Sequence, residues 1–127
     1  MFGNLRILCF HGGIIVNIDN GITYNEGSHE FLTPSLHMSL NELSRMLCNR
    51  LGWNIFEIKV EITWRMLQIG INQAHYVSKP IYSNGNVNSI FRFVRINVIN
   101  MFELYLNSRP RRRNSFSMEL TWVPSNS

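Results

Sequence analysis

Charged side chains near the C-terminus are the residues of this chain best suited to binding chemistry. The run consists of Arg109, Arg111, Arg112 and Arg113, four positive charges within five positions. Such a run is typical of a nuclear import signal or of an arm that binds nucleic-acid phosphates. The alternative is a solvated basic tail. Residues 1–108 hold eight basic and seven acidic residues, so the net charge of +4 is a local feature. Nucleic acid is therefore expected as a partner only through this run.

The remaining polar residues lack the spacing of a catalytic or metal site. Glu57, Glu61 and Glu103 are separated carboxylates, which we expect on solvated strand faces instead of in an acid–base pair. The four histidines, His11, His29, His37 and His75, are scattered at no metal-ligand spacing. Cys9 and Cys48 lie far apart, which predicts two buried, reduced thiols. The sequence therefore predicts a protein that is not an enzyme, with no metal, cofactor or small-molecule substrate.

Residues 36–64 must position whatever surface the protein uses, because they have the clearest structural pattern. Leucines at spacings of three and four line one face of a helix; they are Leu40, Leu43, Leu47 and Leu51. Ser39 and Glu42 predict a capping box at its start, and Gly52 predicts a left-handed residue at its end. The period then changes to two, which predicts a strand with inner residues Phe56, Ile58, Val60, Ile62 and Trp64 and outer residues Glu57, Lys59, Glu61, Thr63 and Arg65.

The flanking segments predict further strands and one more helix. The N-terminal third is expected to be a meander of two to four short strands, with a hairpin turn at residues 19–21. Residues 65–74 are ambiguous: their composition suggests a loop, and their apolar positions have no clean period. Residues 75–82 are a candidate strand. A short helix follows from Asn86, its expected N-cap, to Asn97, and residues 101–106 alternate as a strand, with Glu103 and Tyr105 outward. Residues 1–108 are then one domain, and residues 109–127 a basic, disordered tail.

The element order places the chain in the α+β class. With 45% hydrophobic and 16% charged residues, 127 residues suffice for one packed core. The order ββαββαβ predicts a β-grasp (ubiquitin-like) roll, in which one main helix packs across a mixed sheet beside a second, short helix. No apolar run approaches the ~18 residues of a membrane span, and the N-terminus does not have the pattern of a secretory signal. We therefore expect neither a membrane partner nor secretion.

Five stretches together carry a resemblance to a known family. They are ILCFHGGIIVNIDNGITYNEGS (7–28), MSLNELSRMLCNRLGWN (38–54), VEITWR (60–65), KPIYSNGNVNSIFRFV (79–94) and MFELYL (101–106). In this order they resemble the N-terminal domain of plant Mutator-like (MuDR) transposases, which is similar to the Phox/Bem-one (PB-one) interaction domain. The resemblance covers residues 5–108 and implies a β-grasp fold, a nuclear location (with the cytoplasm as alternative) and a protein partner or a domain of the same kind.

The resemblance also implies what the chain lacks and where it binds. The zinc knuckle and the DDE-type nuclease core that follow this module in the family cannot be placed here, so the chain is expected to be a fragment or stand-alone remnant. Arg6 matches the basic position on the family's first strand, and its alternative is a solvated strand charge. The loop expected to be acidic, residues 83–88, contains no acid, so head-to-tail polymerisation is not expected. The expected partner-binding residues are Arg6, Glu57, Lys59 and Glu61.

Overall fold

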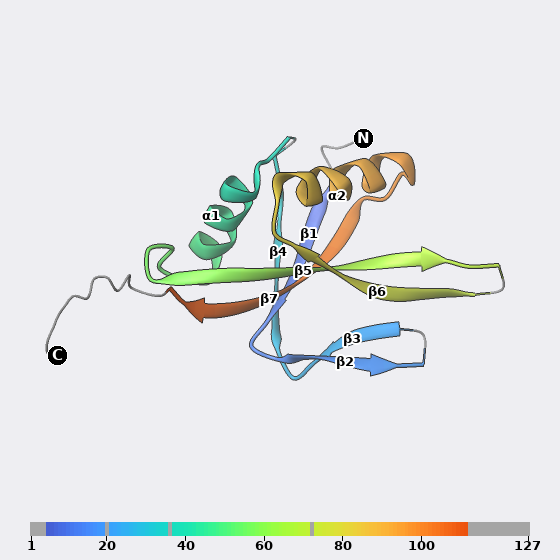
Figure 1. The fold of residues 1–127 in the computed structure, drawn as a ribbon, viewed down its shortest axis with the longest axis horizontal. Coiled ribbons are helices and arrows are strands. Elements are labelled where there is room, and N and C mark those ends of the chain that lie inside the picture. The colour runs from blue at the N-terminus through green and yellow to red at the C-terminus, as the bar shows by residue number, and fades with distance from the viewer. Residues whose placement is uncertain (1–4, 20, 36, 72, 112–127) are drawn as a thin grey trace, which may run out of the picture.

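The computed structural model describes residues 5–19, 21–35, 37–71 and 73–111 (Figure 1). Within these ranges the chain forms the elements β1 (Arg6–His11), β2 (Ile14–Ile18), β3 (Gly21–Asn25), β4 (Ser28–Leu32), α1 (Leu40–Leu51), β5 (Ile58–Ile69), β6 (Ala74–Ile81), α2 (Asn84–Ile96) and β7 (Met101–Pro110). The α+β class is confirmed. The order ββαββαβ is not, because four strands precede α1 where two were expected.

Five strands form one mixed sheet in the order β4-β1-β7-β5-β6. The last strand, β7, lies in its middle, parallel to β1 and antiparallel to β5. The outer strands β4 and β6 are antiparallel to their neighbours. The sheet is compatible with a β-grasp-like arrangement, whereas β2 and β3 pair only with each other as a separate two-stranded sheet.

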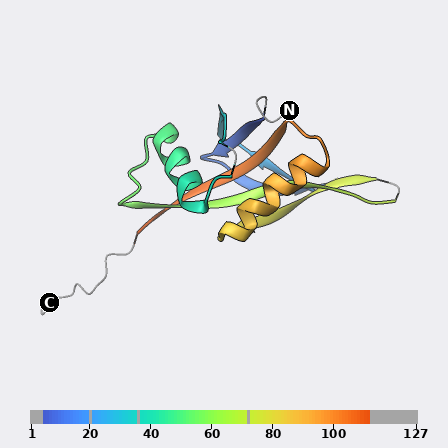
Figure 2. The ribbon, with the colours of Figure 1, turned by 90° about the horizontal axis from the view of Figure 1, so that it is seen from above.

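Both helices cover the same face of the five-stranded sheet, over different parts of it (Figures 1 and 2). Helix α1 has the predicted capping box: the Ser39 side chain accepts from the Glu42 amide, and the Glu42 carboxylate accepts from the Ser39 amide. Gly52 ends the helix at φ 73°, as the leucine pattern predicted. Helix α2 begins earlier than expected, because Ser83 and not Asn86 is its N-cap. None of the described helices has the length and apolar character required to cross a lipid bilayer.

The core lies between this helix face and the sheet. Leu43 and Leu47 of α1 are buried as expected, and Leu40 and Leu51 pack at its margin. Strands and helices both contribute to one hydrophobic cluster, whose largest fully buried members include Leu5, Ile7, Leu43, Leu47, Ile90 and Leu104. Cys9 and Cys48 are buried and free of a disulfide, which confirms their expected state. Contiguous burial of such side chains is the main favourable term for folding.

The β2–β3 hairpin covers the opposite face of the sheet (Figure 1). The Tyr24 ring of β3 packs on Tyr105 of β7, with ring centroids 4.9 Å apart, and on Phe10 of β1 at 5.6 Å. Tyr105 is only 3% exposed, so its predicted outward position is wrong in one respect: the side chain leaves the helix face but is buried under the hairpin. Each face of the sheet is therefore covered in part.

The boundaries of three predicted segments are wrong. Phe56 is 86% exposed and Glu57 lies in a turn, because β5 begins only at Ile58. Residues 65–74, whose sequence is ambiguous with a loop suggested, are largely strand, since β5 continues through Ile69 and forms eight consecutive residue pairs with β6. Strand β7 runs to Pro110, two residues into the segment expected to be a tail. Beyond Arg111, the expected disordered tail lies outside the described residues.

Candidate functional site

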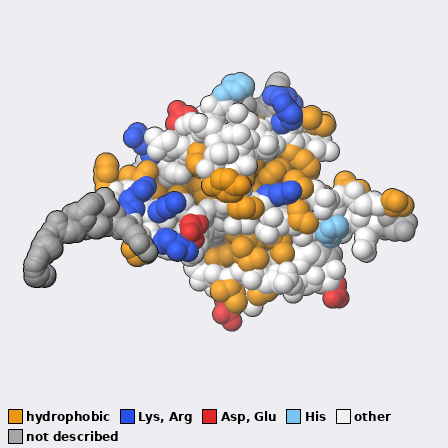
Figure 3. Space-filling view, in the orientation of Figure 1, with side chains coloured by type: hydrophobic (Ala, Val, Ile, Leu, Met, Phe, Trp, Pro, Cys, Tyr) orange, Lys and Arg blue, Asp and Glu red, His pale blue; other side chains and the backbone are white. Residues whose placement is uncertain are grey.

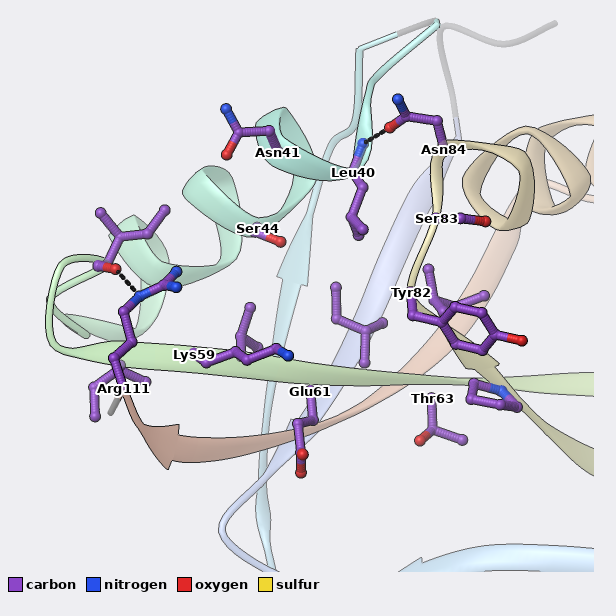
Figure 4. A pocket seen from close by; sticks show the side chains of 16 residues that line it. Leu40, Asn41, Ser44, Lys59, Glu61, Thr63, Tyr82, Ser83, Asn84 and Arg111 are labelled. Carbon is purple, nitrogen blue, oxygen red and sulfur yellow. Dashed lines mark hydrogen bonds between the residues drawn. The ribbon is translucent and has the colours of Figure 1, made fainter. Parts of the chain in front are cut away.

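A groove of about 750 Å3 lies on the helix face between α1 and the start of α2 (Figure 4). Its floor is the inner side of β5, made by Ile58, Val60 and Ile62. Ile62 is buried, whereas Ile58 and Val60 remain half-buried because neither helix covers them. Leu40 and Ser44 of α1 form one wall. The other wall is formed by Pro80, Ile81, Tyr82, Ser83 and Asn84, with the Tyr82 side chain 75% exposed. The groove is thus an apolar strip with a polar rim.

Three hydrogen bonds border the groove at its two sides, and two of them are drawn in Figure 4. The Leu40 amide, at the start of α1, donates to Asn84 Oδ1 at 2.8 Å and so ties the starts of the two helices together. On the far side, Arg111 Nε donates to the Ile55 carbonyl oxygen at 2.7 Å, and the Arg111 amide donates to the Glu57 carbonyl oxygen at 2.8 Å. The groove width is therefore set by bonds between segments that are 44 and 56 residues apart in the chain.

The charged rim of the groove is basic on balance. Lys59 and Arg111 both line it and are exposed. Glu61 also borders it, but its carboxylate points away from the helices (Figure 4). There Arg109 Nε lies 2.8 Å from Oε2, and the side-chain Nδ2 of Asn107 donates to Oε1 at 3.1 Å. Lys and Arg side chains gather where β5 begins and β7 ends (Figure 3). Lys59 and Arg111 are thus placed to meet an acidic group of a bound partner.

The structure brings together only some of the expected partner-binding residues. Lys59 and Glu61 lie at the start of β5 and line the groove, whereas Glu57 lies in the turn just before β5 and is not among the residues that line it. Arg6 lies elsewhere: it pairs with Met101, at the opposite end of β7 from Arg109, the register partner of Lys59. Eight residues of strand separate the two positions by about 26 Å. The Arg6 guanidinium instead lies over the Phe31 ring, 4.4 Å from its centroid.

Two of the four arginines of the C-terminal run are bonded to the body of the domain. Arg109 belongs to β7 and forms the ion pair with Glu61, and Arg111 holds the carbonyl of Ile55. Both are therefore engaged with the body of the domain and do not act as tail residues. Arg112 and Arg113 lie outside the described residues.

The charged side of β5 is not a free surface along its whole length. Arg65 reaches under the β2–β3 hairpin, where its Nε donates to the Ile22 carbonyl oxygen at 2.9 Å. Its Nη1 lies 3.2 Å from Glu103 Oε1, and its Cζ lies 3.4 Å from the Tyr76 ring centroid. Side-chain exposures of 13% for Arg65 and 21% for Glu103 leave little of either for a partner. The expectation of a solvated Glu103 is therefore wrong.

The titratable groups of the described residues were compared with the grouping that a metal ion requires. Across the residues that the structure describes, no three His, Cys, Asp or Glu side chains come close enough to hold a metal ion. Burial raises the pKa of the Cys9 thiol to about 12, with a smaller contribution from the Glu30 carboxylate, so this thiol is a poor nucleophile. Burial likewise raises the pKa of Cys48. The groove suits binding by shape and charge.

Several groove residues were not singled out by the sequence. Leu40 was expected in the core, yet its side chain also lines the groove, and Ser44, Tyr82 and Asn84 carried no motif. The one available signal was Tyr82, a large aromatic residue two positions after Pro80, at the end of the expected strand. The groove depends on the distance between two helices, which no local pattern encodes.

The comparisons with known proteins add no relative. No protein-family model matches the chain, and no curated protein matches it.

Proposed function

We propose that the protein is a non-catalytic interaction module that binds an extended segment of another protein in the groove between α1 and α2. The observation that carries this proposal is the uncovered strip of β5, where Ile58 and Val60 lie half-buried between two walls. Strand and groove surfaces of this kind accept extended peptides, whose alternate side chains enter the apolar floor. The partner segment has alternating apolar residues and an acidic residue that meets Lys59 or Arg111.

The fold proposed for this module is the β-grasp roll. Support comes from the parallel pairing of β1 with β7 in the middle of a mixed sheet. If the β2–β3 hairpin is an insertion after the first strand, the remaining elements follow the order ββαββαβ. The lineage proposed is that of plant Mutator-like transposases, as a fragment or remnant without the DDE core. A DDE-type reading frame directly downstream in the source genome would support this lineage, and unrelated sequence there would count against it.

A peptide-display selection on the full chain tests the groove. We expect extended peptides with alternating apolar residues and at least one acid. Ser44→Trp places a large ring in the groove and should weaken the selected peptides at least about tenfold. Ser89→Trp is the matched control, because Ser89 is an exposed serine of the other helix that does not line the groove. Equal binding to both variants would contradict the proposal, as would a selection that enriches no such peptide.

The second candidate function is accessory nucleic-acid binding through residues 109–113. The gathering of basic side chains at the end of β7 favours it (Figure 3), although Arg109 and Arg111 already hold Glu61 and Ile55. A titration with duplex DNA at several salt concentrations tests nucleic-acid binding. Each phosphate that the protein neutralises adds about −0.9 to the slope of the logarithm of the binding constant against the logarithm of the salt concentration. A slope near zero would exclude this function.

We propose the same arginine run as the signal for nuclear import. Replacement of the four arginines by alanine should shift a tagged full-length protein from the nucleus towards the cytoplasm. An unchanged distribution would rule out the run as an import signal. Glu61→Gln, which releases Arg109 without removing it, is the control that separates loss of the signal from loss of the ion pair.

A further inference from the structure

Four strands have an edge that pairs with no other strand in the described part of the chain: β4 and β6 of the five-stranded sheet, and β2 and β3 of the hairpin. Strand β3 lies against β6, where the Gly21 backbone approaches that of Tyr76, so its edge is partly covered. The other three edges are open templates for an additional strand unless their residues discourage it.

The edge strands differ in the residues that discourage pairing. Strand β4 carries Glu30, and β6 carries Lys79 and Pro80. Strand β2 reads IIVNI, with no charge, proline or glycine. Three of its five side chains are large, apolar and exposed: Ile14 is 59%, Ile15 42% and Ile18 44% accessible. An uncharged apolar edge of this kind favours pairing with another strand.

We infer that β2 pairs antiparallel with β2 of a second copy of this chain, about a twofold axis at Val16. The backbone geometry allows this register. Ile18 and Gly21 are the register partners next to the two-residue turn, so they exchange both backbone hydrogen bonds. Alternation then directs the backbone groups of Ile15 and Asn17 away from β3. In the inferred register Ile15 faces Asn17 of the second copy, and each of the two such pairs contributes two hydrogen bonds.

The side chains on the face of β2 that carries Ile14, Val16 and Ile18 are complementary to themselves in this register. Ile14 lies opposite Ile18 of the second copy, and Val16 lies opposite Val16, so apolar residues meet apolar residues. Asp19 lies opposite Gly13, which keeps the two Asp19 carboxylates apart. A foreign strand would need to match this pattern, whereas a second copy supplies it by symmetry.

Pairing also removes a weakness of the hairpin. A two-stranded sheet is marginally stable alone, and two hairpins joined at β2 form a four-stranded antiparallel sheet.

The remaining cost of the pairing is electrostatic repulsion between two carboxylates. Asp19 of the second copy and Glu26 lie on either side of Gly13, two strand spacings or about 10 Å apart. That distance is close to the screening length at physiological salt. Added salt therefore strengthens this association, whereas it weakens an association of oppositely charged faces.

Register-specific disulfide formation tests the pairing in the full chain. In Val16→Cys the two new cysteines are a non-hydrogen-bonded pair with Cα atoms about 4.5 Å apart, a distance that a disulfide spans. This variant should form a covalent dimer under mild oxidation. Ile14→Cys should not, because its partner position is Ile18; a mixture of Ile14→Cys and Ile18→Cys should. The buried Cys9 and Cys48 do not compete.

Sedimentation of the full chain at about 1 µM to about 1 mM measures the association itself. We expect reversible dimers that strengthen with salt. Val16→Lys, which places two ammonium groups together on the axis, should weaken the dimer at least about tenfold. Ile71→Lys is the matched control at a fully exposed isoleucine in the β5–β6 turn and should have little effect.

Two results would overturn the inference. One is a monomer throughout the concentration range, which would leave the β2 edge to a strand of another protein. The other is a dimer in which Ile14→Cys forms disulfides as readily as Val16→Cys. The inference is independent of the groove, and the Ser44→Trp variant separates them: it should abolish peptide binding and leave the dimer intact.

Discussion

The Arg65 guanidinium lies 3.2 Å from the Glu103 carboxylate, and the two residues face each other directly across β5 and β7. The same guanidinium is largely shielded from solvent, because it donates a hydrogen bond to the Ile22 carbonyl oxygen of the hairpin and lies over the Tyr76 ring. One side chain thus joins β5, β7, β6 and β3. The ion pair is the polar centre of the contact between the sheet and the β2–β3 hairpin.

Arg65→Met should lower the free energy of unfolding by about 2–3 kcal/mol, because it leaves the Glu103 carboxylate half-buried and unpaired. The double variant Arg65→Met with Glu103→Met should regain at least half of this loss, since no unpaired charge remains. Chemical denaturation measures both. The control is Glu61→Gln in the exposed Arg109–Glu61 pair, which should cost no more than about 0.5 kcal/mol. Equal effects at the two ion pairs would contradict the difference in their burial.

Gly21 should not tolerate a side chain. Its φ is 123°, and a Cβ at this position would collide with backbone atoms of Tyr76. Gly21→Ala should therefore cost about 3 kcal/mol or more, and should speed amide exchange throughout β2 and β3. Gly12→Ala is the control, because Gly12 has φ 81° but open space around it. Its cost should stay near 1 kcal/mol. Similar costs for both variants would show that Gly21 and Tyr76 are not in close contact.

The stability of the protein should fall at alkaline pH partly through Tyr105. Burial raises the pKa of this phenol to about 12; the nearby Glu103 charge also raises it, whereas Arg65 and a hydrogen bond with Thr23 lower it. The unfolded phenol titrates near 10, so the folded state holds its proton longer. The stabilisation is complete below pH 10 and is lost between pH 10 and 12. Tyr105→Phe should flatten the fall in unfolding free energy over that interval, and an unchanged slope would disprove the assignment.

Both native thiols should resist alkylation. Cys9 and Cys48 are buried, and burial raises the pKa of each. Iodoacetamide at pH 8 should modify them at least about a hundredfold more slowly in the native protein than in urea, as followed by mass spectrometry. A native thiol that reacts as fast as in urea would mean that the helix face opens readily. A cysteine introduced by Ile71→Cys, at a fully exposed position in the β5–β6 turn, is an internal standard for an accessible thiol.

Helix α1 could be predicted from the sequence because its signals are local. The capping residues Ser39 and Glu42, the leucine spacing and Gly52 all lie within one helix length, and each behaves as predicted. The end of β5 could not be predicted in this way. Its last residues are stabilised by backbone pairing with β6 through Ile69 and Ala74, and that pairing needs no alternation of side chains.

The outer face of the sheet and the groove were only partly predictable for a related reason. A period of two assigns Arg65 and Tyr105 to the face away from the helices, and this is what the structure has. The period contains no information about what covers that face, and the placement of the hairpin buries both residues. The groove likewise depends on the bond between Leu40 and Asn84, which are 44 residues apart.

The central position of β7 has a consequence for the way the chain folds during synthesis. The strand completed last lies between β1 and β5, so it joins the first part of the sheet to the rest. While residues 101–110 are still inside the ribosome, β1 with β4 and β5 with β6 can exist only as separate hairpins, each with an open edge. The domain must therefore wait for the last of its described strands, and a released chain truncated before residue 101 should expose both edges to chaperones.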